Sequence, residues 1–187
     1  MILPDAVKRR LLHGASGSRT VNGVTDRHLD PIAEARRQWS LRWPEQADHM
    51  TAVTSIMRAQ QILLAKVEDI LKPYALTFAA YEALRLLAFS RSGSLPMGKI
   101  GVRLMVHPAA VTNAIARLEQ RGLVQRQMSP DDRRVVLATI TPAGRTLAEE
   151  ATDALNQAAF GLPGLTQEQA AEVTAMLHLI RASTGDV

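Results

Sequence analysis

The sequence predicts a mainly α-helical chain with one small β-hairpin. Apolar residues make up 47% of the 187 positions and aromatic residues only 4%, a composition typical of helical proteins rich in Leu, Ala and Val. Apolar side chains recur at intervals of three and four over most of the chain, which indicates amphipathic helices. The stretch 123–140 instead contains two short alternating, β-branched runs, which predict two strands.

The first 75 residues divide into a tail and two helices. Residues 1–29 contain scattered Gly, Ser and Thr and predict a flexible N-terminal tail, and whether Lys8, Arg9 and Arg10 form a basic arm there is left open. Residues 30–75 are assigned to N-terminal helices for dimerisation and a candidate ligand pocket. The pair Asp30-Pro31 is a good helix start, and this first helix should end near Trp43, before Pro44.

A long helix is expected over about 45–72, with apolar residues on two stripes rather than one. One stripe comprises Met50, Val53, Met57, Leu64, Val67 and Leu71, and the other comprises Ala52, Ile56, Ala59, Leu63 and Ile70. A surface helix needs only one apolar face, so two stripes favour packing on its own core and on a second chain. The helix would be about 40 Å long, too long for one small globule.

Residues 76–141 combine short helices with the hairpin. Thr77 should cap a helix that runs to about Ser90, and two further helices are expected over about 96–104 and 108–121, the second closed by Gly122. Strands 123–128 and 135–140 follow, joined by the charged loop 129–134. A short helix, a tight turn, a second helix and a hairpin form a winged helix-turn-helix, the architecture of a DNA-binding domain.

The last segment, 142–187, is assigned to C-terminal dimerisation helices. Thr141-Pro142 restarts a helix, and Thr166 should cap the final one. The sequence predicts that four residues of this final helix face inward: Val173, Met176, Leu177 and Ile180.

Positive charge is concentrated in the middle of the chain. From Arg91 to Arg145 there are nine basic and three acidic residues, a net charge of +6, whereas the whole chain carries +4. Such a distribution points to a polyanionic partner.

The helix 108–121 has two faces of different chemistry. Val111, Ile115 and Leu118 share the side expected to be buried. The opposite side carries small or hydrogen-bonding residues and no acid, which suits major-groove recognition. We therefore expect contacts with double-stranded DNA from Pro108, Ala109, Thr112, Asn113, Ala116, Arg117 and Gln120.

The hairpin loop is expected to be a second contact with DNA. Arg133 and Arg134 lie near its tip, and Arg126 lies on the first strand. A guanidinium on a narrow hairpin can enter a minor groove, where negative potential is concentrated. Asp131 fits such a loop if it orients Arg133 through an ion pair.

Residues 76–144 resemble the MarR family of transcriptional regulators. The resemblance is carried by Leu76-Thr77-Phe78, Leu84-Arg85-Leu86-Leu87, Leu95-Pro96-Met97, Val111-Thr112-Asn113, Arg117-Leu118-Glu119, Arg121-Gly122-Leu123-Val124, Asp131-Asp132-Arg133-Arg134 and Thr141-Pro142-Ala143-Gly144. It implies a cytoplasmic homodimer on pseudo-palindromic DNA, usually a repressor released by a small anionic or aromatic ligand. One departure is His107, where the family usually has a Ser or Thr that caps the recognition helix.

The helix at 31–43 is similar to the extra N-terminal helix of the urate- and phenol-responsive branch of this family. That resemblance implies a ligand pocket, for which the nearest equivalents here are Trp39, Glu82 and Arg103. Glu82 stands where the branch usually has Asp. Structural packing of Trp39 is the alternative interpretation.

Other classes of function find little support. The chain has no cysteine, its five histidines lack metal-ligand spacing and no glycine-rich phosphate loop follows a strand, so we expect no enzyme, metal or cofactor. No apolar run approaches the roughly 20 residues of a membrane span. The remaining alternative is a winged-helix protein-interaction module without sequence-specific DNA binding, which acids on the outer face of 108–121 would have favoured.

Overall fold

The computed structural model describes residues 30–105 and 107–186, which belong to two units. The first unit extends to Thr54 and the second begins at Ser55. The predicted tail 1–29 lies outside the described residues. The predicted division of the chain at residues 75 and 141 stays a prediction.

The first unit contains helix α2 (Pro31–Arg42), the 3-10 turn η1 (Pro44–Gln46) and the beginning of α3. The Asp30 carboxylate accepts the backbone N–H of Ile32 at 2.9 Å and so caps α2, as predicted. An ion pair between Arg36 and Asp48, 2.7 Å long, joins α2 to α3.

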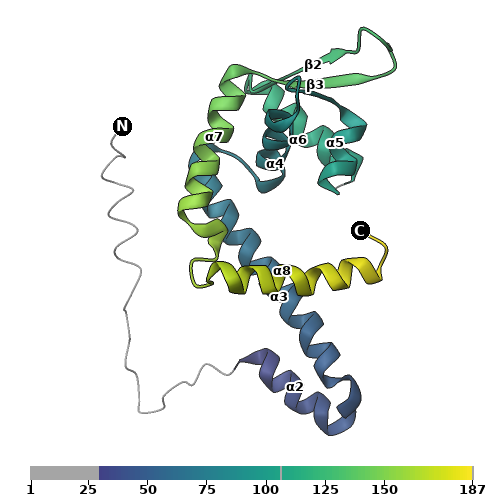
Figure 1. The fold of residues 1–187 in the computed structure, drawn as a ribbon, viewed down its shortest axis with the longest axis vertical. Coiled ribbons are helices and arrows are strands. Elements are labelled where there is room, and N and C mark those ends of the chain that lie inside the picture. Colours follow the sequence, from purple (N-terminus) through teal and green to yellow (C-terminus); the bar gives the residue numbers. More distant parts are fainter. Residues whose placement is uncertain (1–29, 106, 187) are drawn as a thin grey trace, which may run out of the picture. The chain divides into compact units, whose positions relative to one another are not determined.

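The second unit contains most of α3 and all later elements (Figure 1). Their bounds are α3 (Ala47–Leu71), η2 (Lys72–Tyr74), α4 (Phe78–Phe89), β1 (Ser94–Pro96), α5 (Met97–Leu104), α6 (Pro108–Gln120), β2 (Val124–Met128), β3 (Val136–Ile140), α7 (Pro142–Gln157), η3 (Ala159–Gly161) and α8 (Gln167–Ser183). The predicted helices and both hairpin strands are present, with ends within about two residues of the expected ones. The fold is therefore the predicted winged helix-turn-helix with long flanking helices.

The small sheet has three antiparallel strands in the order β1-β3-β2. In the hairpin, Val124 pairs with Ile140 and Met128 with Val136. The sequence predicted only the two hairpin strands and missed β1, which begins at Ser94 and pairs with β3. A three-residue strand that ends in proline is too short to show an alternating pattern, so only its pairing partner reveals it.

The core lies in the second unit, where α4, α6 and α7 pack together beside the sheet. Side chains that are at most 1% exposed come from these elements, from α5 and from the end of α3, and they include Leu71, Leu84, Leu87, Ile100, Ile115, Leu118, Ala138, Ala151 and Leu155. The C-terminal end of α3 is buried here, whereas most of the helix is exposed. The core thus fixes α6 and the hairpin against α4 and α7.

The prediction for the last helix was wrong within the single chain. No residue of α8 is buried, and Val173, Met176, Leu177 and Ile180 are each at least 39% exposed. Their spacing of three and four residues correctly indicated one apolar face, but none of the residues in 30–105 and 107–186 buries it. A sequence pattern identifies such a face without identifying the surface against which it packs.

The start of α7 lies against the junction between α6 and β2. The Thr141 N–H donates to the Leu123 carbonyl at 3.0 Å, and the Thr141 hydroxyl donates to the Gly122 carbonyl at 2.8 Å. The backbone at Gly144 approaches so closely that a Cβ there would lie 2.1 Å from the Leu123 carbonyl oxygen. Glycine is therefore required at this position on steric grounds.

We expect the substitution Gly144→Ala to lower the free energy of unfolding by roughly 1–3 kcal/mol, because the added methyl group overlaps a backbone atom. Urea denaturation followed by circular dichroism measures this change. Gly98→Ala is the matched control, since a Cβ on that helical glycine meets nothing within 4 Å. The control should be stabilised by about 0.5–1 kcal/mol through helix propensity. Equal stability of the two variants would contradict the steric explanation.

Candidate DNA interface

Helix α6 presents the two faces that the sequence predicted. Val111, Ile115 and Leu118 are at most 3% exposed and fix the helix on the core. Of the predicted contact residues opposite them, Ala116 is half-buried and the others whose side chains are described are exposed: Ala109, Thr112, Asn113, Arg117 and Gln120. Pro108 is the first residue of α6, and its side chain lies outside the described set. The outer face is therefore free of the core and carries no carboxylate.

Both ends of α6 are stabilised by specific contacts. At its start, the His107 Nδ1 accepts the backbone N–H of Ala109 at 3.2 Å. The imidazole thus caps the helix, where the family resemblance led us to expect a Ser or Thr hydroxyl. At its end, Gly122 has φ +69°, the left-handed conformation that glycine adopts without a steric penalty.

Arg121 fixes the C-terminal end of α6 to the end of the long helix α3. Its guanidinium donates to the carbonyl of Ala75 at 2.6 Å and to that of Tyr74 at 2.9 Å. These two carbonyls follow α3, where η2 ends and Ala75 has a left-handed backbone. Arg121 is thus a structural residue, although sequence counting placed it among the basic residues that favour a polyanion.

Glu119 and Arg126 join α6 to the hairpin. The Glu119 carboxylate accepts the Arg126 backbone N–H at 3.2 Å and its guanidinium Nε–H at 2.7 Å. The hydrogen bond from the guanidinium lowers the pKa of the Glu119 carboxyl below its usual value. Arg126, counted from the sequence with the wing arginines, is therefore neutralised by an acid of the recognition helix. Sequence reasoning missed this pair because the two residues meet only through the turn at Gly122.

The hairpin loop exposes its two arginines. The Ser129 N–H donates to the Val135 carbonyl at 2.8 Å and closes the loop, and the Asp132 carboxylate accepts the Arg134 N–H at 2.9 Å. Asp131, Arg133 and Arg134 are all exposed. The suggested ion pair between Asp131 and Arg133 does not occur among the described residues. Asp132 instead orders the loop through its backbone contact.

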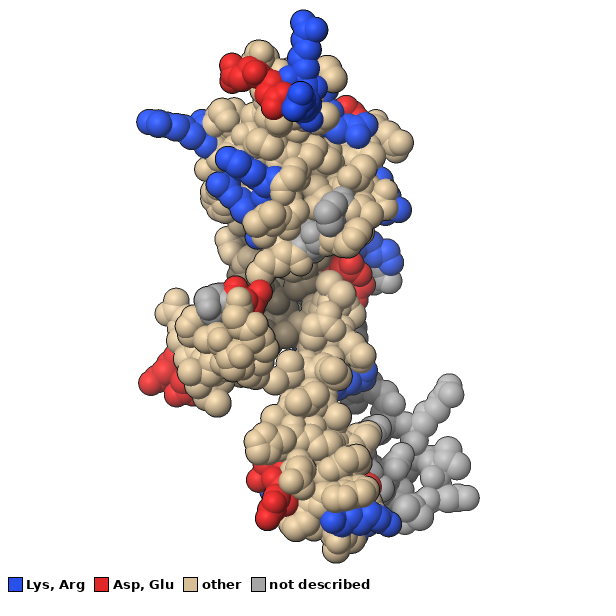
Figure 2. Space-filling model, turned by 90° about the vertical axis from the view of Figure 1, so that its right-hand side faces the viewer, with Lys and Arg blue, Asp and Glu red and all other residues tan. Residues whose placement is uncertain are grey.

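Cationic side chains gather around the helix-turn-helix and the hairpin. Figure 2 shows Lys and Arg side chains projecting from the upper part of the molecule, which includes the hairpin. Six of them are exposed and make no ion pair with any residue that the structure describes: Arg91, Lys99, Arg103, Arg117, Arg133 and Arg134. Their charge is thus not neutralised within the described chain.

The three predicted ligand-binding residues lie on three different helices. Trp39 is on α2, where its ring lies 4.9 Å from that of Trp43, centroid to centroid. Glu82 is half-buried on α4, and burial raises the pKa of its carboxyl. Arg103 is exposed on α5. Their joint role in a ligand pocket stays a prediction.

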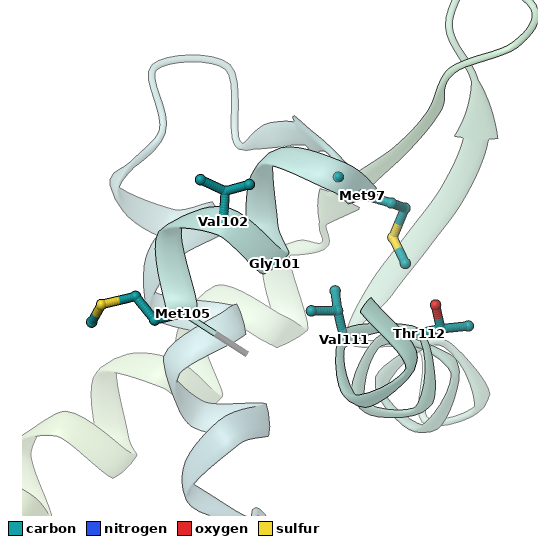
Figure 3. Close-up of a pocket in the computed structure, with 7 residues that line it drawn as sticks. Met97, Gly101, Val102, Met105, Val111 and Thr112 are labelled. Atoms are coloured by element: carbon teal, nitrogen blue, oxygen red, sulfur yellow. The ribbon is translucent and has the colours of Figure 1, made fainter. Parts of the chain in front are cut away.

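A shallow apolar hollow of about 400 Å³ lies between α5 and α6. Figure 3 shows Met97, Gly101, Val102 and Met105 along α5, with Val111 and Thr112 on α6. Neither Glu82 nor Arg103 lines it. Over 30–105 and 107–186, no cluster of His, Asp and Glu is arranged to hold a metal ion, and no helix is long and apolar enough to cross a membrane.

Comparisons with known proteins identify the family of this chain. Residues 76–136 match the sequence model of the MarR family. The structure is similar to that of Sco5413, a MarR family transcriptional regulator from Streptomyces coelicolor, with 53% identity, a TM-score of 0.69 and coverage of 74% of this chain and 96% of that one.

Two further relatives agree with this match. Sco3205, a MarR family regulator from the same organism solved in complex with DNA, is 26% identical with a TM-score of 0.64, covering 73% of this chain and 88% of that one. The HTH-type transcriptional repressor Rv2887 of Mycobacterium tuberculosis is 32% identical over 66% of this chain and 88% of its own length. With the recognition helix, the arginine-tipped hairpin and the glycine-dependent junction in place, the chain belongs to the MarR family of winged helix-turn-helix transcriptional regulators.

Proposed function

We propose that this regulator acts in the cytoplasm as a homodimeric repressor, without catalytic activity, that binds a pseudo-palindromic operator and is released from it by a small molecule. The observation that carries the DNA-binding part is the outer face of α6, which has hydrogen-bonding and cationic side chains and no acid. The hairpin next to α6 in the chain carries two exposed arginines in its loop. Sco3205, a family member 26% identical to this chain, has been solved in complex with DNA, which supports the proposal.

On this proposal, α6 enters the major groove and the hairpin lies along the adjacent minor groove. The small side chains of Ala109 and Ala116 allow close approach to base edges, while Asn113 and Arg117 supply donors and acceptors for sequence recognition. Arg133 and Arg134 approach the phosphates or the minor groove from the loop. The exposed cations that lack an ion pair within the described chain are available for phosphates, and release of DNA counterions then supplies affinity.

The homodimer is supported by apolar surface that the second unit leaves exposed. In addition to the apolar stripe on α8, several large apolar side chains of α3 are between 38% and 61% exposed: Ile56, Met57, Ile62 and Leu64. Extended apolar surfaces of this kind mark protein interfaces. A two-fold dimer would set two copies of α6 about one turn of DNA apart, matching a pseudo-palindrome.

Two substitutions should separate base recognition from backbone binding. Asn113→Ala should reduce discrimination between the operator and scrambled DNA by about 1–3 kcal/mol, because it removes contacts with base edges. Arg133→Ala should weaken binding to both duplexes by a similar factor, because it removes a contact that carries little sequence information. Fluorescence anisotropy with labelled duplexes at fixed salt concentration measures both effects.

The control for lost charge is Arg58→Ala, since Arg58 is an exposed arginine of α3 far along the chain from the helix-turn-helix. It should bind both duplexes as the wild type does. Equal losses for Asn113→Ala and Arg133→Ala on both duplexes would refute this division between the helix and the hairpin. Absence of DNA binding by the wild type would favour the protein-interaction alternative.

For the dimer, we expect Met57→Glu to abolish assembly, because it would bury an unpaired carboxylate in the interface. Analytical ultracentrifugation should show monomer or aggregate for this variant and a dimer for the wild type. The conservative replacement Met57→Leu should remain dimeric. A well-folded dimer of Met57→Glu would place Met57 outside the interface.

For release by a ligand, we expect an aromatic acid to bind through Arg103, with Trp39 stacking on its ring and Glu82 accepting a proton or orienting the arginine. Salicylate and urate should then quench tryptophan fluorescence and release DNA from the wild type, and Arg103→Ala should require a higher concentration of either. Because Arg103 is also an exposed cation, the DNA affinity of Arg103→Ala is measured first without ligand. A ligand that releases DNA equally well from both proteins would exclude Arg103 from the pocket.

A further inference from the structure

The side chain of His107 has one nitrogen that accepts a hydrogen bond within the protein and a second that bonds to none of the described residues. Nδ1 accepts the N–H of Ala109, so in the neutral ring this nitrogen carries the lone pair and the proton is on Nε2. The ring is exposed, and no residue that the structure describes accepts a hydrogen bond from Nε2. The cap thus fixes the tautomer and leaves an N–H donor on the far side of the ring.

The backbone donors in the first turn of α6 are already used. Pro108 has no N–H, and Ala109 donates to the imidazole. Ala110 and Val111 donate to the His107 carbonyl at 2.9 and 3.4 Å. A helix start usually offers free N–H groups to an anion, but this one does not. The Nε2–H of His107 is therefore a side-chain donor that this end of the recognition helix presents to its surroundings.

The position of that donor matches the face that we propose for DNA. His107 is two residues before Ala109, which begins the outer face of α6, and Ala109 is exposed and small. A duplex that contacts Ala109 and Asn113 would come within reach of the ring. Hydrogen-bond acceptors are frequent on DNA, both as phosphate oxygens and as the N7 atoms of purines in the major groove.

We propose that His107 is a DNA-contacting residue: its Nδ1 caps the recognition helix while its Nε2–H donates to an acceptor on DNA, a phosphate oxygen or a purine N7. This assignment rests on the proposed DNA-binding function and adds a residue to it. The imidazole then serves both as the cap and as a donor beyond the helix end.

Two substitutions separate the cap from the DNA contact. His107→Asn keeps an acceptor close to the backbone, which caps helices well, but has no group that reaches as far as Nε2. His107→Gln keeps a distant N–H donor and loses the good cap. The experiment measures the Tm of each full-length variant, and its affinity for a duplex selected by the wild type from a randomised 30-base-pair library and for a scrambled duplex.

We expect His107→Asn to keep the Tm of the wild type and to lose about 3- to 10-fold in DNA affinity, the effect of one hydrogen bond. His107→Gln should have a lower Tm and, well below it, an affinity closer to that of the wild type. An equal loss for His107→Asn on both duplexes identifies a phosphate as the acceptor, and a loss confined to the selected duplex identifies a base.

Wild-type affinity in His107→Asn would overturn the proposal, since His107 would then serve only as a cap. Loss of binding confined to His107→Gln would overturn it as well. Failure of the wild type to bind any duplex is a different result, because it would remove the proposed function itself rather than the role of His107 alone.

Discussion

The winged helix-turn-helix depends on the close backbone approach between the first turn of α7 and Leu123. At this point the recognition helix ends, the first hairpin strand begins, the second hairpin strand ends and α7 starts. Thr141 donates from its N–H to the carbonyl of Leu123 and from its hydroxyl to that of Gly122. The Leu123 carbonyl also lies so close to Gly144 that no side chain fits at position 144. Because four elements are joined over so short a distance, the direction of the hairpin is tied to that of α6. The Glu119–Arg126 pair is a second link between α6 and the first hairpin strand.

The positive charge of the central segment has two separate roles. Arg121 and Arg126 are used internally, one on the carbonyls after α3 and one on Glu119. The arginines of the hairpin loop and Arg117 on α6 are exposed and make no ion pair with the described residues. A count of basic residues treats both groups alike, although only the second group can neutralise phosphate without breaking an internal contact. Arg121 also joins the end of α6 to the carbonyls that follow α3.

The long helices differ from the winged helix-turn-helix in how far their apolar side chains are buried. The core buries the end of α3 and one face each of α4, α6 and α7, but no residue of α8. The large apolar residues of the α8 stripe and several large apolar residues of α3 are each at least 38% exposed, and apolar residues exposed together on one helix face often mark a protein interface. A second copy of the chain, as proposed, would bury this surface and at the same time pair two recognition helices.

The sequence by itself determined the order and bounds of the helices, the two faces of α6 and the hairpin, because each is encoded in local periodicity, caps and turn residues. Asp30, Thr77 and Thr166 cap the helices that they were predicted to cap. Tertiary structure alone decided which side chains meet across the chain. It paired β1 with β3, brought Glu119 to Arg126 and Arg121 to Tyr74 and Ala75, and left every residue of α8 unburied by the described part of the chain. These features depend on how elements that are separate in the sequence pack against one another, and no local pattern records that packing.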